Sequence, residues 1–239
     1  MSHKIAFTPS QIIRAAKYAR ENNEPFLQVC PVADKPNIYH LYVYNRKTRD
    51  YVPLRLKCRS QLLVGKIFNM HNDDYTRPRF TFVLDLKHPD PIQKVFAEAM
   101  MLLQNEMQSI KRLKECLSPI YVKEHGDAIF KANLRTVWNN KMLITAKLRD
   151  ISCNAEISPE RLDYKNIHTS IPPKSVVSCV IEMYEIVKLD DSGKQWLKTV
   201  INKADVTPYE HVPEAISCQT SDEDESEDDF NEETQNDQI

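Results

Sequence analysis

Residues 38–59 read IYHLYVYNRKTRDYVPLRLKCR, a stretch in which two apolar runs flank a short basic segment. The first run consists largely of β-branched and aromatic residues, which favour extended strands. In the second run, from Tyr51 to Arg59, apolar residues alternate with basic ones, which is typical of a strand with one buried and one wet side. The polar segment Asn45–Asp50 lies between them. The stretch therefore predicts a β-hairpin with a charged tip.

The same hairpin combines cations with tyrosines. Between residues 46 and 59 there are six basic residues and one acidic residue. Proteins that bind single-stranded nucleic acid need both kinds of side chain, because cations meet phosphates and aromatic rings stack on bases, at roughly 1–3 kcal/mol per base. The candidate binding residues in this hairpin are Tyr42, Tyr44, Arg46, Lys47, Arg49, Tyr51, Arg55, Lys57 and Arg59. A structural interpretation also stays open, because tyrosine favours strands and basic residues occupy any wet sheet face.

Helices are predicted on both sides of this hairpin. Thr8-Pro9-Ser10-Gln11 has the pattern of a capping box with proline at the first helical position, and it predicts a short N-terminal helix. Asp90-Pro91-Ile92-Gln93 is a second such start. The apolar residues after it recur at spacings of three and four as far as Leu113, which predicts a long helix with one buried stripe.

Further strands are predicted before and after the long helix. Residues 79–86 alternate and would place one apolar face inward, made of Phe80, Phe82, Leu84 and Leu86. Residues 129–138 and 142–151 flank Asn139-Asn140, a short turn signal, and predict a second hairpin. The runs 176–189 and 194–203 predict a third hairpin. These later hairpins add the candidate binding residues Lys131, Arg135, Trp138, Lys141, Lys147, Arg149, Trp196 and Lys198.

The order of these elements indicates an α+β fold with mainly antiparallel strands. Three strands, one long helix and then two further strands suggest an oligonucleotide-binding (OB) type of barrel, with the helix between the third and fourth strands. The N-terminal helix and the hairpin of residues 176–203 would be additions to that core. The chain has only three glycines. Because small curled barrels commonly use glycines or bulges at their corners, a more open α+β sheet is the alternative.

Composition argues against an enzyme. With three glycines, no phosphate-cradling loop, dinucleotide fingerprint or nucleophile elbow can be assembled. The seven histidines are isolated from one another, and the six cysteines form no CxxC pair. Scattered cysteines of this kind fit reduced thiols better than a zinc site or a disulfide framework. We therefore predict a protein without catalytic activity, metal or cofactor.

The last twenty residues, 220–239, carry ten carboxylates and neither Lys nor Arg. Because the whole chain has 32 basic and 34 acidic residues, residues 1–219 hold 24 acids (34 minus 10) against 32 bases, a net charge of +8. A block of like charges stays solvated because it cannot recover the entropy of ordering. Such a tail can be a solubility appendage, or it can occupy a cationic groove until nucleic acid displaces it.

Domain boundaries follow from these shifts in composition. We expect one OB-like domain with its additions over residues 1–205, a linker over 206–219 and a disordered acidic tail over 220–239. The tail residues of interest are Asp222, Glu223, Asp224, Glu225, Glu227, Asp228, Asp229 and Phe230. No stretch approaches the roughly 20 apolar residues of a membrane span, and the N-terminus lacks the apolar region of a secretory signal. We therefore expect a soluble intracellular protein without a membrane partner; an oligomer is possible.

The order of parts resembles a family, the single-stranded DNA-binding proteins of large DNA viruses. The resemblance is to the poxvirus type and to related acidic-tailed phage proteins. It lies in the helix Pro9–Glu21, the cation-rich strands, the Phe80–Leu86 strand leading into the 91–113 helix, the Leu117–Tyr121 segment and the acidic tail with Phe230. The resemblance implies an OB-type core that binds single strands without sequence preference. It also implies a tail that contacts replication proteins and competes for the binding groove.

The leading hypothesis is thus a single-stranded DNA-binding protein acting in viral DNA replication or recombination. Its partners would be single-stranded DNA and, through the tail, replication proteins. The alternative from another class is an interaction or transcription accessory protein that uses the acidic tail as its partner surface. Retention of the tail-less body on single-stranded DNA cellulose distinguishes the two hypotheses.

Overall fold

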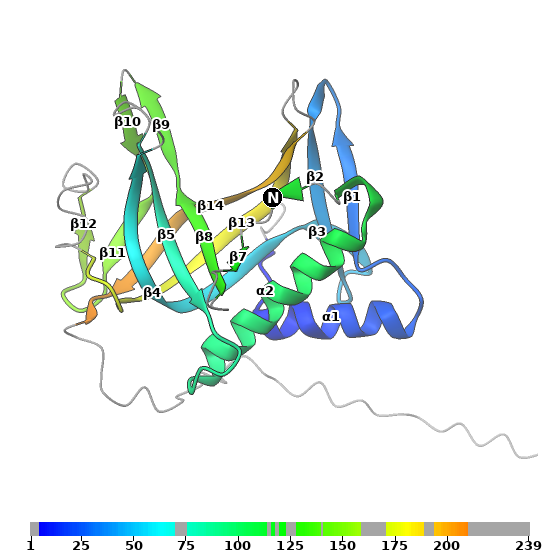
Figure 1. Ribbon diagram of the computed structural model, residues 1–239, viewed down its shortest axis with the longest axis horizontal. Coiled ribbons are helices and arrows are strands. Elements are labelled where there is room, and N and C mark those ends of the chain that lie inside the picture. The colour runs from blue at the N-terminus through cyan, green and yellow to red at the C-terminus, as the bar shows by residue number, and fades with distance from the viewer. Residues whose placement is uncertain are drawn as a thin grey trace, which may run out of the picture.

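The computed structural model describes residues 5–69, 76–113, 116–117, 120–122, 128–139, 141–158, 171–188 and 194–209 (Figure 1). The helices are α1 (Pro9–Glu21), α2 (Pro91–Ser109) and the short 3-10 helix η1 (Lys111–Leu113). The strands are β1 (Leu27–Val32), β2 (Lys35–Asn45), β3 (Asp50–Pro53), β4 (Arg55–Asn69), β5 (Thr76–Leu84), β6 (Cys116–Leu117), β7 (Ile120–Val122), β8 (Ala128–Leu134), β9 (Thr136–Asn139), β10 (Lys141–Ile144), β11 (Lys147–Asp150), β12 (Ala155–Ile157), β13 (Val176–Lys188) and β14 (Gln195–Thr207). The fold is α+β, as the pattern of elements predicted.

Five strands form a closed ring. β4 pairs with β5, β5 with β8, β8 with β14, β14 with β13, and β13 returns to β4. All of these pairs are antiparallel except β8 and β14. Register shifts in β4 and β13, between Leu62 and Val64 and between Cys179 and Ile181, supply irregular points that bend the strands. In this chain, which has few glycines, bulges therefore provide the bends that close the ring.

The third predicted hairpin is central rather than additional, which corrects the expectation for residues 176–203. The first part of β13 pairs with β4, and residues 185–187 pair with β2. β14 pairs with β13 on one side and with β8, β11 and β6 on the other. Because both strands are flanked on two sides, their inward residues, such as Ile181 and Ile201, are fully buried.

The strand predicted over residues 51–59 is broken at Leu54. Residues 50–53 form β3, which pairs with β2 as the predicted hairpin requires, with Tyr44 opposite Tyr51. The Leu54 amide donates to the Leu41 carbonyl at 3.1 Å, whereas its own carbonyl accepts from the amide of Met183 at 3.0 Å. At Leu54 the chain thus changes its hydrogen-bonding partner from β2 to β13. From Arg55 onward the strand belongs to the ring.

The second predicted hairpin is also interrupted. The carbonyl of Arg135 accepts hydrogen bonds from the amides of Thr145 and Ala146 at 2.8 and 3.1 Å, and the Arg135 amide donates to Ile201 at 2.9 Å. Beyond this point β9 and β10 pair only with each other and project above the ring in Figure 1. After the interruption, β11 pairs in parallel with β14.

The two helices lie side by side against one side of the ring (Figure 1). α1 begins with the predicted capping box, in which Thr8 and Gln11 satisfy each other's backbone amides. α2 begins at the cap Asp90 and ends at Ser109 instead of Leu113, because Ile110 is extended. Its residue Phe96 joins Phe82 and Phe130 in the core, with ring centroids 6.1 to 6.2 Å apart. Leu86, expected on the inner face of β5, lies beyond the strand and is 49% exposed.

Candidate nucleic-acid interface

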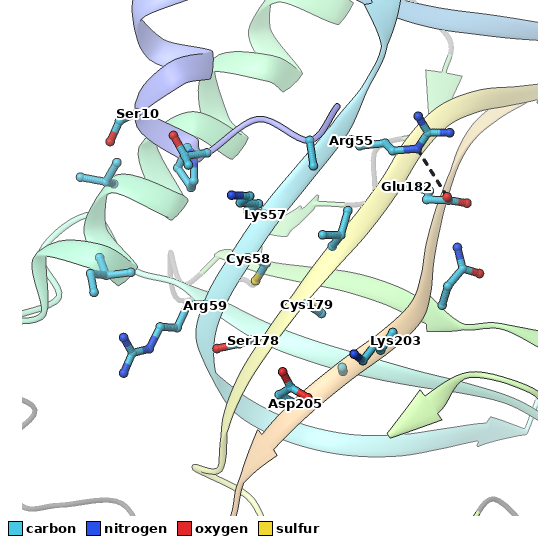
Figure 2. Close-up of a pocket in the computed structure, with 18 of the residues that line it drawn as sticks. Ser10, Arg55, Lys57, Cys58, Arg59, Ser178, Cys179, Glu182, Lys203 and Asp205 are labelled. Atoms are coloured by element: carbon cyan, nitrogen blue, oxygen red, sulfur yellow. Dashed lines mark hydrogen bonds and ion pairs between the residues drawn. The ribbon is translucent and has the colours of Figure 1, made fainter. Parts of the chain in front are cut away.

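A groove of about 910 Å³ lies on the outer face of β4, β13 and β14. The starts of α1 and α2 line it as well, through Thr8, Pro9 and Ser10 from the first helix and Pro91, Ile92 and Val95 from the second. Figure 2 shows its labelled side chains, which come from all three strands and from Ser10 of α1. We call this feature the groove.

Three predicted phosphate contacts line the groove from β4. Leu54, Leu56 and Cys58 point inward and are buried, so the residues between and after them point outward. The outward residues Arg55, Lys57 and Arg59 lie opposite Glu182, Val180 and Ser178 of β13. The alternation seen in the sequence thus places these three cations in one row along the groove.

Sequence reasoning missed a fourth cation of the groove, Lys203. Strict alternation from the buried Ile201 would turn Lys203 inward. In the structure, Ile201 pairs with Ile181 and Ala204 with Cys179, so that two residues of β14 oppose the single residue Val180. This bulge puts Lys203 on the exposed outer face. Only the pairing partner reveals the bulge, and no signal within residues 194–203 indicates it.

Several groove cations have no acidic partner in the part of the chain that the structure describes. Arg55 pairs with Glu182 at 3.5 Å, and Arg149 of β11 pairs with Asp205 at 2.9 Å. Of the residues that the structure describes, none places a carboxylate within 4 Å of Lys57, Arg59 or Lys203. The same holds for Lys147, which lies beside Lys203 in the parallel register of β11 and β14. Neighbouring cations repel one another, so this side of the ring favours an anionic ligand.

Both helices present their N-terminal ends to the groove. Neither helix has an acidic residue in its first turn, although Asp90 caps α2. The exposed amides of a helix start carry partial positive charge and favour anions. Their position adds to the positive potential of the groove.

The flank formed by β8 and by Arg135, the residue that follows it, carries two more predicted contacts. Arg135 donates a hydrogen bond from Nη1 to Oδ1 of Asn202, a groove residue, at 2.9 Å. Lys131 is half-buried, and burial together with the nearby charge of Arg79 lowers its pKa. Both residues lie on the outer face of the ring, because the inward positions of β8 belong to Phe130, Ala132 and Leu134.

The tyrosines of the first hairpin pack elsewhere. The ring of Tyr44 is parallel to that of Tyr18 from α1, with centroids 6.1 Å apart, and Tyr51 meets it edge-on at 5.5 Å. We call Tyr18, Tyr44 and Tyr51 the tyrosine cluster. Arg46 covers the Tyr18 ring of this cluster, with its guanidinium carbon 4.8 Å from the ring centroid. These rings join α1 to β2 and β3 and do not line the groove.

Hydrogen bonding fixes Tyr51 in this cluster. Its hydroxyl donates to the carbonyl of Pro25 at 2.6 Å. Burial, with smaller contributions from Glu24 and Tyr44, raises the pKa of this phenol. On the same strand as Tyr44, the hydroxyl of Tyr42 lies 3.4 Å from Nδ1 of His40.

The remaining predicted contacts lie away from the groove or outside the described residues. Lys47 and Arg49 are exposed in the turn between β2 and β3. Trp196 is half-buried on β14 opposite Val187, and Lys198 pairs with Glu185. The side chains of Trp138 and Lys141 and the whole acidic segment Asp222–Phe230 lie outside the described residues.

In the described part of the chain, no group of three or more His, Cys, Asp or Glu side chains is placed to hold a metal ion. None of its helices is both long and apolar enough to cross a membrane.

Comparison with known proteins finds similarity only among solved structures. No family model matches the chain, and no curated protein matches it significantly. The single-stranded DNA-binding protein from bacteriophage Enc34, in complex with single-stranded DNA, is 13% identical with a TM-score of 0.35 over 74% of this chain and 94% of its own. A second structure of the Enc34 protein is 13% identical, with a TM-score of 0.36 over 82% of this chain and 98% of its own. Bacteriophage T7 gp2.5, also a single-stranded DNA-binding protein, is 13% identical, with a TM-score of 0.35 over 64% of this chain and 91% of its own. At these TM-scores, the likeness carries no inference about what this chain binds.

Proposed function

We propose that this chain binds single-stranded DNA without sequence preference, with the phosphates held in the groove. The observation that carries the proposal is the set of cations Lys57, Arg59 and Lys203, which have no acidic partner among the described residues and lie on a concave surface that two helix starts also line. Lys147 extends this set onto β11. Backbone phosphates are the ligand that such a row of cations meets most effectively.

The architecture supports a single strand as the ligand. A closed ring of five strands with mixed pairing is the general build of the OB barrel, which binds oligonucleotides across its strands and connecting loops. Contacts between cations and phosphates carry no sequence information, so the binding would be independent of sequence. The phage proteins named above bind the same ligand, but the proposal rests on the groove.

The proposed role is in viral DNA replication or recombination, with the acidic tail as an internal competitor. The ten carboxylates of residues 220–239 would occupy the groove until a more densely charged strand displaces them. The released tail would then be available to replication proteins.

Salt dependence tests the binding. If about five phosphates are neutralised, the logarithm of the association constant for oligo(dT) should fall with the logarithm of salt concentration with a slope near −3.5, at about −0.7 per contact. A slope near zero would contradict the proposal. Passage of the tail-less body straight through single-stranded DNA cellulose would favour the accessory protein that uses its tail as the partner surface.

Tail deletion tests the competition. Removing residues 220–239 should tighten oligo(dT) binding at low salt and change it little at high salt, where charges are screened. The matched control keeps the tail length and replaces its ten carboxylates by Asn and Gln. Equal affinities of all three proteins at low salt would show that the tail does not compete.

A further inference from the structure

The groove contains an aliphatic surface as well as its cations. Val180 points outward from β13 and is 37% exposed, one of the few large apolar side chains so exposed in the described part of the chain. It lies directly opposite Lys57 of β4, and on its other side lie Asn202 and Lys203 in the bulge of β14. Apolar side chains of the helix starts, Ile92 and Val95, line the same groove. An apolar strip is therefore bordered by cations.

None of the described residues that line the groove is aromatic. Two of the three tyrosines predicted to bind, Tyr44 and Tyr51, pack instead in the tyrosine cluster. A strand whose phosphates contact Lys57 and Lys203 would consequently meet aliphatic carbon, and not an aromatic ring, at the position of its bases.

We propose that Val180, together with Ile92 and Val95 of the same groove, forms the base-binding subsite. This inference rests on the proposed function and deepens it by naming how the bases are held. Each base would bury part of its apolar face against Val180, while the phosphates on either side contact Lys57 and Lys203. Removal of apolar surface from water favours this contact.

The chemistry of the subsite predicts its selectivity. The side chains of valine and isoleucine have no hydrogen-bond donor or acceptor, so the subsite cannot read the edge of a base. Every base has an apolar face, and all four would bind similarly. The subsite therefore distinguishes a strand that has bases from one that lacks them.

The test compares two strands of equal length and charge, oligo(dT) and an abasic strand, with the full-length protein. We expect the wild type to bind oligo(dT) about tenfold more tightly than the abasic strand, which corresponds to about 1.4 kcal/mol. Val180→Thr keeps the shape of the side chain and replaces a methyl group by a hydroxyl. It should weaken oligo(dT) binding about threefold to fivefold and leave the abasic strand and the salt slope unchanged.

The control is Val137→Thr, the same substitution at an exposed valine of β9 that does not line the groove. It should change neither the affinity for oligo(dT) nor the affinity for the abasic strand. Thermal melting should show that both variants are folded. Equal affinity of the wild type for both strands, an equal loss for both strands in Val180→Thr, or a base-dependent loss in Val137→Thr would each overturn the inference. Absence of binding to either strand at low salt would instead contradict the proposed function.

Discussion

The tyrosine cluster and the groove come from adjacent stretches of one sequence pattern, but the structure uses them differently. Tyr44 and Arg46 pack against Tyr18 of α1, and Tyr51 packs against Tyr44. Lys57 and Arg59 remain exposed in the groove without acidic partners among the described residues. Interleaved cations and rings in a sequence therefore do not show which side chains share one surface of the fold. What lies against each face of the strand decides its role.

The change occurs at Leu54. Before this residue, β3 pairs with β2 beside α1, so the aromatic side chains of these strands pack against other aromatic side chains. After it, β4 enters the five-stranded ring, and on its outer face only the starts of α1 and α2 line the groove, among the described helices. The cations of β4 are therefore left facing an open groove.

The largest expected effect separates the two regions by charge. Lys57→Gln, Arg59→Gln and Lys203→Gln together remove three groove cations. Losing three phosphate contacts should reduce the salt slope by about 2 and weaken oligo(dT) binding roughly 100-fold at 0.1 M salt. Fluorescence anisotropy at several salt concentrations measures both quantities.

The matched control removes three cations from the hairpin tip, through Arg46→Gln, Lys47→Gln and Arg49→Gln. It should weaken binding less than about threefold, because the loss of long-range attraction is screened at this salt concentration. If the control weakens binding as much as the groove variant or more, the binding surface is the hairpin and not the groove.

The next effect concerns the stability of the tyrosine cluster. Tyr44→Ala removes a ring packed between Tyr18 and Tyr51, and should lower the free energy of unfolding by about 2 kcal/mol. Affinity for oligo(dT) should stay unchanged. Urea denaturation measures the free energy of unfolding. The control is Tyr209→Ala, at a residue that is 49% exposed, and it should change this free energy little. A loss of affinity without loss of stability would assign base stacking to Tyr44.

A smaller effect isolates one hydrogen bond of the same cluster. Tyr51→Phe leaves the ring and removes the hydroxyl that donates to Pro25. Unfolding free energy should fall by about 1 kcal/mol. Tyr39→Phe is the control, because the Tyr39 hydroxyl has no hydrogen bond among the described residues. Equal stability of Tyr51→Phe and the wild type would show that this bond contributes nothing net.

The smallest effect tests whether the phosphate path extends from the groove onto β8. Burial and Arg79 lower the pKa of Lys131 below its usual value of 10.5. If Lys131 contacts a phosphate, oligo(dT) affinity should decline by at most about fivefold as pH rises through this lowered pKa, because one contact is lost. Lys131→Arg should abolish the decline, since arginine keeps its charge.

The titration of Lys131 does not itself unfold the protein. When the pKa of a lysine is lower in the folded state, the unfolded state binds more protons in the interval between the two pKa values. The contribution of Lys131 to stability therefore rises with pH in that interval. A pH-independent affinity in the wild type would place Lys131 outside the path.

Local patterns predicted much of the secondary structure. The capping box of Thr8 and Gln11 is a short-range signal, and α1 begins there. Alternation from Leu54 to Arg59 predicted the outward row of β4 because residues two apart share a face of a strand. Binding by these residues is still a proposal. The predictions failed where a distant strand intervened, as for Lys203, whose orientation depends on the bulge opposite Val180.

By itself, the sequence determined that the protein is an α+β chain with two capped helices, a basic body and an acidic tail. These properties depend on composition and on neighbours within a few residues. Only the tertiary structure decided that residues 176–203 form the centre of the ring, that Leu54 separates the tyrosine cluster from the groove, and that Lys203 faces outward. Each of these outcomes depends on hydrogen bonds between strands far apart in the chain, and no local pattern records which strands will pair.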